Sequence, residues 1–258
     1  MLLDGKVAMV SGIGRGLSRS IAFALAEHGA KVVLTGIDDT VGEEIAKEMA
    51  LAGYESRYLH ADVTDVDQCA SAALRVHEDF GHIDTLVNVA YLYRTRASTL
   101  NADLDDWRDM MEVIFYGSVN MSRAVAPYMR EQGEGRIVMI NTTGTILVRE
   151  DSGGYASAKG ALATLTRVLA KELGRFGIRV NAIHPSYIYS DNLKDDFARR
   201  AKERGVDPQV LHDEAAGETA LGYLPEPDEI AGSVVFLASD LSRPVTGQHF
   251  AVCAGRSA

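Results

Sequence analysis

The sequence predicts one α/β domain, with a single doubly wound parallel sheet covered by helices on both faces. Short apolar runs alternate with longer amphipathic stretches from the first residues onward. That alternation is typical of strand–helix–strand crossovers, which build parallel sheets. The 258 residues contain no repeat, low-complexity tract or Pro/Gly-rich linker, so residues 1–258 are expected to form one domain.

The first half of the chain is expected to hold four strands and the helices between them. Val7–Val10 predicts the first strand, and Leu17–His28 predicts a helix that Gly29 ends at the position after its C-cap. A helix over Thr40–Leu51 would have Thr40 as its N-cap. The other elements expected here are the strands Lys31–Thr35, Ser56–Ala61 and Thr85–Asn88 and the helix Asp65–Phe80.

The second half is expected to begin with one long helix over Leu104–Glu131, followed by a strand over Arg136–Asn141. A helix over Gly154–Phe176 then precedes the strand Ile178–Ile183. Residues 190–227 are polar and rich in charge, and they follow the carboxyl end of that strand. Because ligands of open α/β sheets bind beyond those ends, this segment is expected to cover a substrate pocket. A solvated surface excursion is the alternative.

Composition disfavours several classes of partner. A net charge of −10 and a pI near 5.2 argue against nucleic acid or an anionic membrane. No segment has the run of apolar residues that crosses a bilayer, and the N-terminus carries no charged leader, so a cytoplasmic protein is expected. Cys69 and Cys253 are expected to be small buried hydrophobes, and no metal site is expected.

A glycine-rich turn follows the first expected strand, with the sequence Ser11-Gly12-Ile13-Gly14-Arg15-Gly16-Leu17-Ser18. Glycine allows positive φ and a close approach to a pyrophosphate, and the helix N-terminus beyond presents unpaired N–H groups to the anion. An isolated turn of this kind is often an ordinary turn. Its place within the first strand–helix–strand unit favours dinucleotide binding.

Tyr155 and Lys159 form the most informative pair in the chain. Residues four apart on a helix share one face, so a phenol and an ammonium can reach the same ligand. A neighbouring cation favours the phenolate and is expected to lower the pKa of Tyr155 from about 10 toward the working range. The phenol can then exchange a proton with a substrate oxygen. Such pairs also occur by chance on helix surfaces, so the surrounding sequence has to decide.

Taken together and in this order, these features resemble the short-chain dehydrogenase/reductase family over nearly the whole chain. The glycine turn resembles TGxxxGxG, Asn88-Val-Ala90-Tyr91 resembles NNAG, and Pro185–Ser190 resembles PGxxxT. Asn181-Ala-Ile-His-Pro185, Pro227-Asp-Glu-Ile-Ala and Thr246-Gly-Gln follow the family's order. The resemblance implies a Rossmann fold and an NAD(P)-dependent oxidoreductase that interconverts a small to medium ketone and a secondary alcohol.

The resemblance also implies roles for individual residues. Tyr155 would be the general acid/base, and Lys159 would orient the cofactor ribose and tune the phenol. Thr142, thirteen residues before the tyrosine, would polarise the substrate oxygen in place of the family's serine; Thr143 and Asn141 are the alternatives if the register shifts by one. The cofactor would contact Gly12, Arg15, Gly16, Leu17, Ile37, Asp62, Val63, Asn88, Ala90, Tyr155, Lys159, Pro185, Ile188 and Ser190.

Two signals at the expected adenine end of the site oppose each other. The second strand leads to Gly36, at the position of the acidic residue that holds a ribose 2′-hydroxyl, and Ile37 follows where phosphate-binding relatives often carry arginine. Arg15 favours a 2′-phosphate, whereas Asp38 and Asp39 oppose one. We expect a slight preference for NADP(H) over NAD(H).

Five positions near the expected site depart from the family pattern: Ser18, Val89, Tyr91, Ile114 and Ser186. Ser18 replaces a glycine; its hydroxymethyl group is expected to be accommodated by a small shift or to bond locally to backbone, with weaker cofactor binding. Ile114 replaces an asparagine and cannot bond a water, so proton exchange would be slow or follow another route. A nucleotide-binding regulatory or scaffolding protein with impaired turnover is therefore the alternative to an enzyme. Val252-Cys-Ala-Gly255 also departs from VDGG, which is expected to affect packing or assembly.

The substrate side of the pocket is expected to be bordered by Tyr91, Tyr93, Arg94, residues 145–149, Tyr187, Tyr189 and the segment after Ser190. These aromatic and apolar side chains suggest a moderately hydrophobic substrate. Arg94, Arg96 or Arg149 would pair with a substrate carboxylate, unless they face solvent. Relatives pair the long helices that hold Trp107 and Tyr155, so a homodimer or homotetramer is expected.

Overall fold

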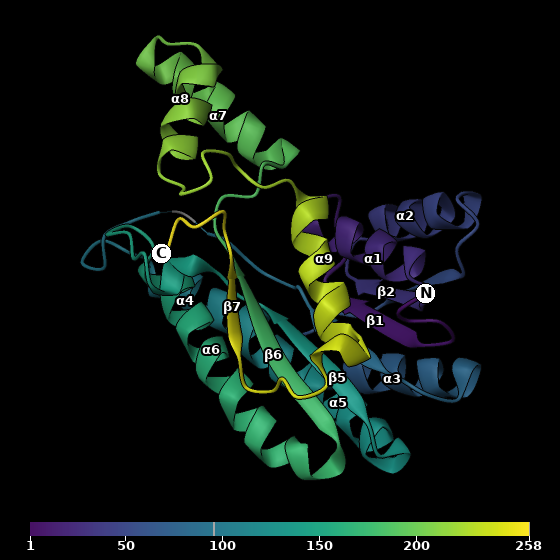
Figure 1. Cartoon of the computed structure of the whole chain (residues 1–258). Coiled ribbons are helices and arrows are strands. Elements are labelled where there is room, and N and C mark those ends of the chain that lie inside the picture. The colour runs from purple at the N-terminus through teal and green to yellow at the C-terminus, as the bar shows by residue number, and fades with distance from the viewer. Residues whose placement is uncertain (95, 258) are drawn as a thin grey trace.

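Seven short strands lie side by side in the order β3-β2-β1-β4-β5-β6-β7, and all their pairings are parallel (Figure 1). The computed structural model describes residues 1–94 and 96–257, and the strand and helix counts refer to these. The strands are β1 (Val7–Ser11), β2 (Lys31–Gly36), β3 (Ser56–His60), β4 (Thr85–Asn88), β5 (Gly135–Ile140), β6 (Ile178–Pro185) and β7 (His249–Val252). The strand order changes direction between β1 and β4, which opens a crevice at their carboxyl ends.

Helices cover both faces of the sheet, so the predicted doubly wound α/β class is confirmed (Figure 1). One face carries α1 (Leu17–Glu27), α2 (Asp39–Leu51) and α9 (Pro227–Ala238); the other carries α3 (Val66–Phe80), α4 (Leu104–Met111), α5 (Gly117–Gln132) and α6 (Gly153–Leu173). None of the helices among the described residues is long and apolar enough to cross a membrane.

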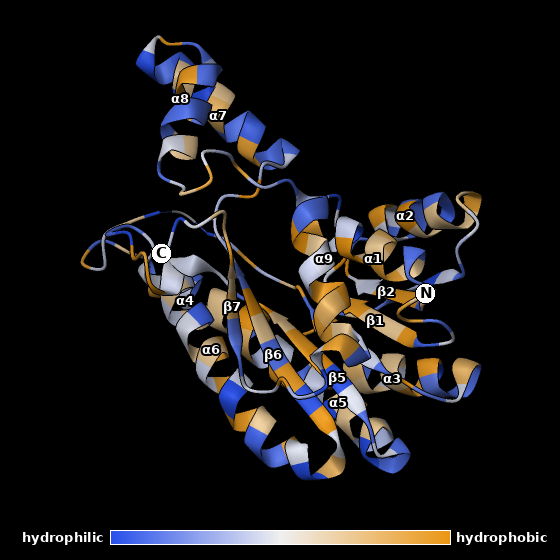
Figure 2. Cartoon of the chain, in the orientation of Figure 1, coloured by the Kyte–Doolittle hydropathy of each residue, from blue (hydrophilic) through white to orange (hydrophobic). Residues whose placement is uncertain are grey.

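The apolar strands separate two hydrophobic cores, one under each helical layer. Side chains alternate along β1: Ala8 and Val10 enter the core beneath α1 and α9, and Val7 and Met9 enter the core beneath α3 and α5. All five residues of β1 are buried, as expected for a strand covered on both faces. Figure 2 shows this arrangement as hydrophobic strands between helices whose polar sides face outward.

The observed order of elements follows the prediction, with three differences. The predicted N-cap Thr40 is wrong, because Asp38 adopts extended backbone and its carboxylate accepts the Val41 N–H at 3.1 Å. The predicted long helix is interrupted by a π-helical turn, η1 (Glu112–Tyr116), between α4 and α5. The elements α9 and β7 were not predicted from the sequence, although the Glu226 capping box at the start of α9 is a readable signal.

Residues 190–227 are ordered as two helices that stand apart from the sheet beyond the carboxyl end of β6 (Figure 1). They are α7 (Asp191–Arg204) and α8 (Pro208–Gly217). The pair is largely hydrophilic on its outside (Figure 2) and has a small apolar core of its own. That core contains Phe197, Ala201, Leu211, Ala215, Ala216 and Leu224.

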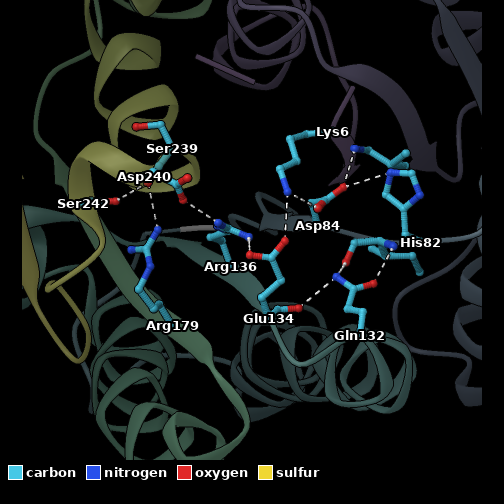
Figure 3. Close-up of polar contacts among 12 residues, drawn as sticks. Lys6, His82, Asp84, Gln132, Glu134, Arg136, Arg179, Ser239, Asp240 and Ser242 are labelled. Carbon is cyan, nitrogen blue, oxygen red and sulfur yellow. Dashed lines mark hydrogen bonds and ion pairs between the residues drawn. The ribbon is translucent and has the colours of Figure 1, made fainter. Parts of the chain in front are cut away.

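A polar network joins the amino ends of the central strands (Figure 3). Asp84 is 3% exposed, and its carboxylate accepts the Val7 N–H at 2.8 Å and the Lys6 ammonium at 3.0 Å. Lys6 also donates to Glu134, and the buried Arg136 donates to Asp240 at 2.7 Å. Buried charges are retained where such partners satisfy them. The network therefore stabilises the amino edge of the sheet, while the carboxyl edge is left free for a ligand.

Candidate active site

The carboxyl ends of β1, β2, β4, β5 and β6 border a cavity of about 740 Å³. It lies at the change of strand direction, where open α/β sheets bind their ligands. All but one of the predicted cofactor residues line it, and so do the three predicted catalytic residues. The predicted residues in its lining are Gly12, Arg15, Gly16, Leu17, Ile37, Asp62, Val63, Ala90, Thr142, Tyr155, Lys159, Pro185, Ile188 and Ser190.

The glycine turn forms one end of the cavity. Gly12 has a φ of +93°, and a Cβ there would lie 2.4 Å from the backbone of Ala90, so only glycine fits. A Cβ on Gly16 would meet no protein atom within 4 Å, and Gly16 places no capping side chain over α1. The first N–H groups of α1 therefore face open space, which suits a pyrophosphate.

Ser18 fits into the turn without displacing it. Its hydroxyl accepts the Gly14 N–H at 2.8 Å and donates to the Gly14 carbonyl at 3.2 Å. The side chain is buried against the start of α1. Of the two predicted outcomes for this serine, local bonding to backbone is the one observed; the expected weakening of cofactor binding stays a prediction.

The residues expected to choose between cofactors are already paired with protein groups. Arg15 makes two hydrogen bonds to Glu44, at 2.6 and 2.7 Å, and both side chains are more than half exposed. The carboxylate of Asp38 caps α2, and Asp39 accepts from Tyr58 at 2.9 Å and pairs with His60. Only Arg15 and Asp38 of these residues line the cavity. A 2′-phosphate would thus compete with Glu44 for an accessible guanidinium.

Asn88 differs from the prediction, because it does not border the cavity. Its side chain is 4% exposed, and its amide lies 3.3 Å from both the Ser122 hydroxyl and the Met139 sulfur. Alternation along β4 turns this side chain toward α5 and away from the ligand. Asn88 therefore supports the wall of the cavity from behind.

Thr142 borders the cavity beside the Tyr155 phenol, with which its hydroxyl interacts. Its Oγ1 accepts the Gly144 N–H at 3.0 Å, which leaves the O–H to donate toward the phenol or toward a ligand oxygen. The Thr142 N–H donates to the side-chain oxygen of Asn141 at 2.8 Å. Of the alternatives, Thr143 is buried outside the cavity lining, whereas Asn141 borders the cavity and holds the Thr142 backbone. These contacts favour Thr142 as the hydroxyl donor.

Tyr155 lies in the first turn of α6, where close packing fixes its place. A Cβ on Gly154 would come within 2.5 Å of Met110 and 2.8 Å of Trp107, so α4 and α6 meet closely there. The Tyr155 ring packs against Tyr93 at 5.0 Å between centroids. The phenol is thereby held at the cavity wall by side chains from two other segments.

Lys159 is buried, with 2% exposure, and its Nζ donates to the Ile140 carbonyl at 2.6 Å. The ammonium stands 5.8 Å from the centroid of the Tyr155 ring. Burial lowers the pKa of Lys159 to about 7. The lysine is therefore only partly charged at neutral pH in the cofactor-free chain.

The predicted lowering of the Tyr155 pKa is wrong for the cofactor-free chain. Burial raises the pKa of Tyr155, the nearby phenols of Tyr91 and Tyr93 add to the rise, and the Thr142 hydroxyl opposes it. Desolvation, which disfavours the phenolate, is the largest cause of this rise. The phenol is therefore held in its protonated form.

Ile114 occupies the π-helical turn η1, and its side chain is fully buried. Its carbonyl accepts the Ser118 hydroxyl at 2.7 Å. The Ile114 side chain has no polar atom to bond a water, so slow proton exchange and exchange by another route both stay predictions.

The substrate side of the cavity agrees with the prediction only in part. Tyr91 and Arg94 line it as predicted. Residues 145–149, Tyr187 and Tyr189 lie outside the lining, because the first segment is turned to solvent and the two tyrosines pack against the α7–α8 core. Tyr93 also lies outside, behind Tyr155. Sequence reasoning missed Leu92, in the loop after β4, and Asp109, Glu112 and Val113, which the end of α4 and the π-helical turn bring to the cavity.

The three arginines considered for a substrate carboxylate have acidic neighbours. Arg94 donates to Asp109 at 2.9 Å, and Arg96 and Arg149 lie about 4 Å from Asp151. Of the three, Arg94 alone borders the cavity.

Two histidines support the backbone of Thr142. His184 Nδ1 donates to the Thr142 carbonyl at 2.9 Å, so His184 Nε2 accepts from His249 Nδ1 at 2.8 Å when both rings are neutral. His249 Nε2 is then a buried lone pair with no partner among the described residues. Burial, His184 and Arg167 lower the pKa of His249 to about 4.

We expect this pair to weaken the fold in mild acid. Between pH 6.5 and about 4 the unfolded chain binds a proton at position 249 that the folded chain does not, so stability falls as pH drops through this range. Allowing for the partial exposure of the ring, the loss is about 1–2 kcal/mol. Urea unfolding of the wild type and His249→Gln at several pH values measures it. If the free energy of unfolding of the two proteins fell equally between pH 6.5 and about 4, the expectation would be contradicted.

Comparison with known proteins shows which family the chain resembles along nearly its whole length. The family model described as enoyl-(acyl carrier protein) reductase matches residues 12–257. The chain is 37% identical over 254 residues to the short-chain reductase protein NovJ of Streptomyces niveus, covering 97% of this chain and 93% of that one. It is 33% identical over 259 residues to trans-4-hydroxycyclohexanecarboxylate dehydrogenase of Sinomonas cyclohexanicum, covering 98% and 93%. A gluconate 5-dehydrogenase from Burkholderia cenocepacia, solved with NADP and tartrate, superposes with a TM-score of 0.89 at 31% identity, over 99% of this chain and 96% of that one.

Proposed function

Because the chain belongs to the short-chain dehydrogenase/reductase family and is an oxidoreductase, we propose that it interconverts a small to medium ketone and the matching secondary alcohol with Tyr155 as acid/base. One observation carries this proposal: Thr142, Tyr155 and Lys159 line the same cavity whose other end is the glycine turn. A hydroxyl donor, a protonated phenol and a buried amine are the groups that carbonyl reduction requires beside a nicotinamide.

In this reaction Thr142, Tyr155 and Lys159 have separate roles. The nicotinamide cofactor, when bound, supplies or accepts the hydride at the substrate carbon. The Thr142 O–H donates a hydrogen bond to the substrate oxygen, and the Tyr155 phenol delivers the proton that oxygen needs on reduction. Lys159, whose Nζ stands 5.8 Å from the centroid of the Tyr155 ring, would hold the cofactor ribose and tune the phenol. The same groups act in reverse during alcohol oxidation.

The lining supports an uncharged, moderately hydrophobic substrate. Tyr91, Leu92 and Val113 supply apolar surface beside the catalytic residues. Arg94 is neutralised by Asp109, so a substrate carboxylate would have to displace that partner. Because both side chains are about half exposed, such an exchange costs little, and an acidic group remains acceptable at the mouth of the cavity.

For the cofactor we propose a slight preference for NADP(H), carried by Arg15. Its pair with Glu44 is exposed and therefore weak, and a 2′-phosphate offers a stronger bidentate partner. Arg15→Gln is expected to weaken NADPH binding by about tenfold, with NADH binding changed by less than about twofold. Asp38→Asn keeps the helix cap and should strengthen NADPH binding, because it removes a charge that opposes the phosphate. Fluorescence titration measures all four affinities, and equal changes for both cofactors would contradict this assignment.

We also propose that two or four copies of the chain associate through α4, α5 and α6. Exposed large apolar side chains lie at Leu104 of α4, at Tyr116 of η1, just before α5, and at Val168 of α6. Large exposed apolar residues on neighbouring helices are typical of interfaces. Light scattering at micromolar concentration should give twice or four times the 27.9 kDa chain mass. A monomer at all concentrations would reject the proposal.

The test of the function has two steps. Thermal-shift titration with NADH and NADPH establishes cofactor binding, and a panel of carbonyl compounds then measures cofactor oxidation by the wild type and by Tyr155→Phe. Turnover that requires Tyr155 supports the enzyme. Cofactor binding without any Tyr155-dependent turnover supports the alternative, a nucleotide-binding regulatory or scaffolding protein. Absence of binding to both cofactors rejects both.

A further inference from the structure

The C-terminal residues meet the edge of the cavity and the α7–α8 pair at one point. The chain leaves β7 at Val252 and turns through Ala254, which has a φ of +50°. Beyond this turn, the Ala254 carbonyl accepts the Leu221 N–H at 3.1 Å. The C-terminus lies at the same edge of the sheet as α7 and α8 (Figure 1). The last residues therefore touch the segment that returns from α8.

Arg256 makes the central contacts at this point. Its Nε donates to the Glu218 carboxylate, at the C-terminal end of α8, at 2.8 Å, and a second guanidinium nitrogen contacts the same carboxylate. Its Nη1 donates to the Ser186 hydroxyl at 3.0 Å. The guanidinium also stacks over the Tyr187 ring, 4.2 Å from the centroid. The arginine side chain is only 19% exposed, so these contacts are largely shielded from solvent.

The contacts of Arg256 explain one departure from the family pattern. Ser186 replaces a glycine and borders the cavity, and its hydroxyl supplies the acceptor for Arg256. Tyr187, the next residue, packs under the apolar core of the α7–α8 pair. A planar guanidinium suits both the carboxylate and the aromatic face, which an ammonium does not. One side chain thus joins the cavity wall, the base of α7 and the end of α8.

We infer that Arg256 is a positioning residue, which holds the α7–α8 pair against the cavity loop at Ser186 and so fixes that wall of the cavity. The inference rests on the proposed function for its kinetic consequence. Loss of the guanidinium frees α8 from the loop and lets the loop move. Binding in the cavity then weakens, for the substrate and for the cofactor expected along the same loop, while Thr142 after β5 and Tyr155 on α6 keep their places.

Hydrogen exchange and kinetics test this inference together. Arg256→Ala is expected to speed amide exchange in residues 191–224 by about tenfold, whereas Arg243→Ala, at an exposed arginine near the C-terminus, leaves exchange unchanged. Arg256→Lys should resemble Arg256→Ala, because one ammonium cannot keep the contacts to Glu218 and Ser186 together with the stacking on Tyr187. KM for the carbonyl should rise by about fivefold in Arg256→Ala, with kcat changed by less than about twofold.

A double-mutant cycle separates positioning from general destabilisation. Ser186→Ala alone should raise KM, but in the Arg256→Ala background it should add less than about twofold, because the shared contact is already lost. The inference would be overturned if the two substitutions raised KM independently, so that their effects multiplied. It would also be overturned if amide exchange in Arg256→Ala were as slow as in the wild type. Exchange needs no substrate. A chain that reduces no carbonyl yet shows faster exchange in Arg256→Ala would refute the proposed function and leave the mechanical contact standing.

Discussion

Replacing Tyr155 by phenylalanine is expected to lower carbonyl turnover by about 10²–10⁴-fold and to leave cofactor affinity within about twofold. The variant keeps the ring and its packing against Tyr93 and removes only the proton donor. Because the lost group acts on the substrate oxygen in the transition state, kcat and kcat/KM should fall together. Stopped-flow measurement of NADPH oxidation, with cofactor titration on the same samples, separates the two quantities.

The neighbouring phenol supplies the matched control for this experiment. Tyr93→Phe removes a hydroxyl from the ring that packs on Tyr155 but does not border the cavity. It is expected to change turnover by less than about threefold, since no proton transfer passes through it. Equal losses in Tyr155→Phe and Tyr93→Phe would point to disturbed packing and would remove the case for Tyr155 as the acid/base.

Because the pKa of Tyr155 is raised, the rates of carbonyl reduction and of alcohol oxidation are expected to depend differently on pH. Reduction uses the protonated phenol, which burial stabilises, so its rate should stay flat between about pH 7 and 9. Alcohol oxidation needs the phenolate, so its rate should rise with pH over the same range. A reductive rate that falls steeply from pH 7 would show that another group donates the proton.

The fold class could be predicted from the sequence, because apolar runs and amphipathic stretches alternate along the whole chain and errors at single residues do not change that pattern. The wrong predictions concern features that depend on local backbone geometry. Both Asp38 and Thr40 have side chains that can cap a helix, so residue type alone does not distinguish them. Asp38 is the N-cap because its backbone is extended there. The π-helical turn Glu112–Tyr116 does not change the spacing of apolar residues, so the sequence did not indicate it. Its residues Glu112 and Val113 border the cavity, and they were therefore not predicted.

The place of the candidate site in the fold could be predicted from the sequence, but the side-chain orientations and pKa shifts within it could not. Motif spacing placed Thr142, Tyr155 and Lys159 on one cavity, since residue order determines which strand ends meet. Spacing carries no information on which face of β4 receives Asn88, nor on how far burial shifts a pKa. The direction of the Tyr155 shift depends on desolvation, which only the packed structure specifies.

Lys159→Met is expected to stabilise the cofactor-free chain while reducing turnover by about 10²-fold or more. The ammonium is almost fully buried, and within residues 1–94 and 96–257 its one hydrogen bond is that to the Ile140 carbonyl. Desolvation is the cause of its lowered pKa. Methionine has a similar length and no charge, so it fills the same space without that penalty.

The pH dependence of this gain follows from the shift. Between pH 7 and 10.5 the unfolded chain keeps a proton on Lys159 that the folded chain has lost, so wild-type stability rises with pH across this window. The advantage of methionine is therefore greatest below pH 7 and shrinks toward pH 10.5. After allowance for the lost hydrogen bond, it amounts to roughly 2–4 kcal/mol at pH 7, or a rise in Tm of about 5–15 °C.

Calorimetry and urea unfolding at pH 6.5, 8 and 9.5 measure the effect, with Lys171→Met, an exposed site on the same helix, as the control. The control should stay within about 0.5 kcal/mol of the wild type. A gain at Lys159 that shrinks as pH rises, together with lost turnover, identifies an amine kept for chemistry at a cost in stability. A loss of stability in Lys159→Met would instead make the lysine a structural support for the Ile140 carbonyl, and its part in the reaction would need separate proof.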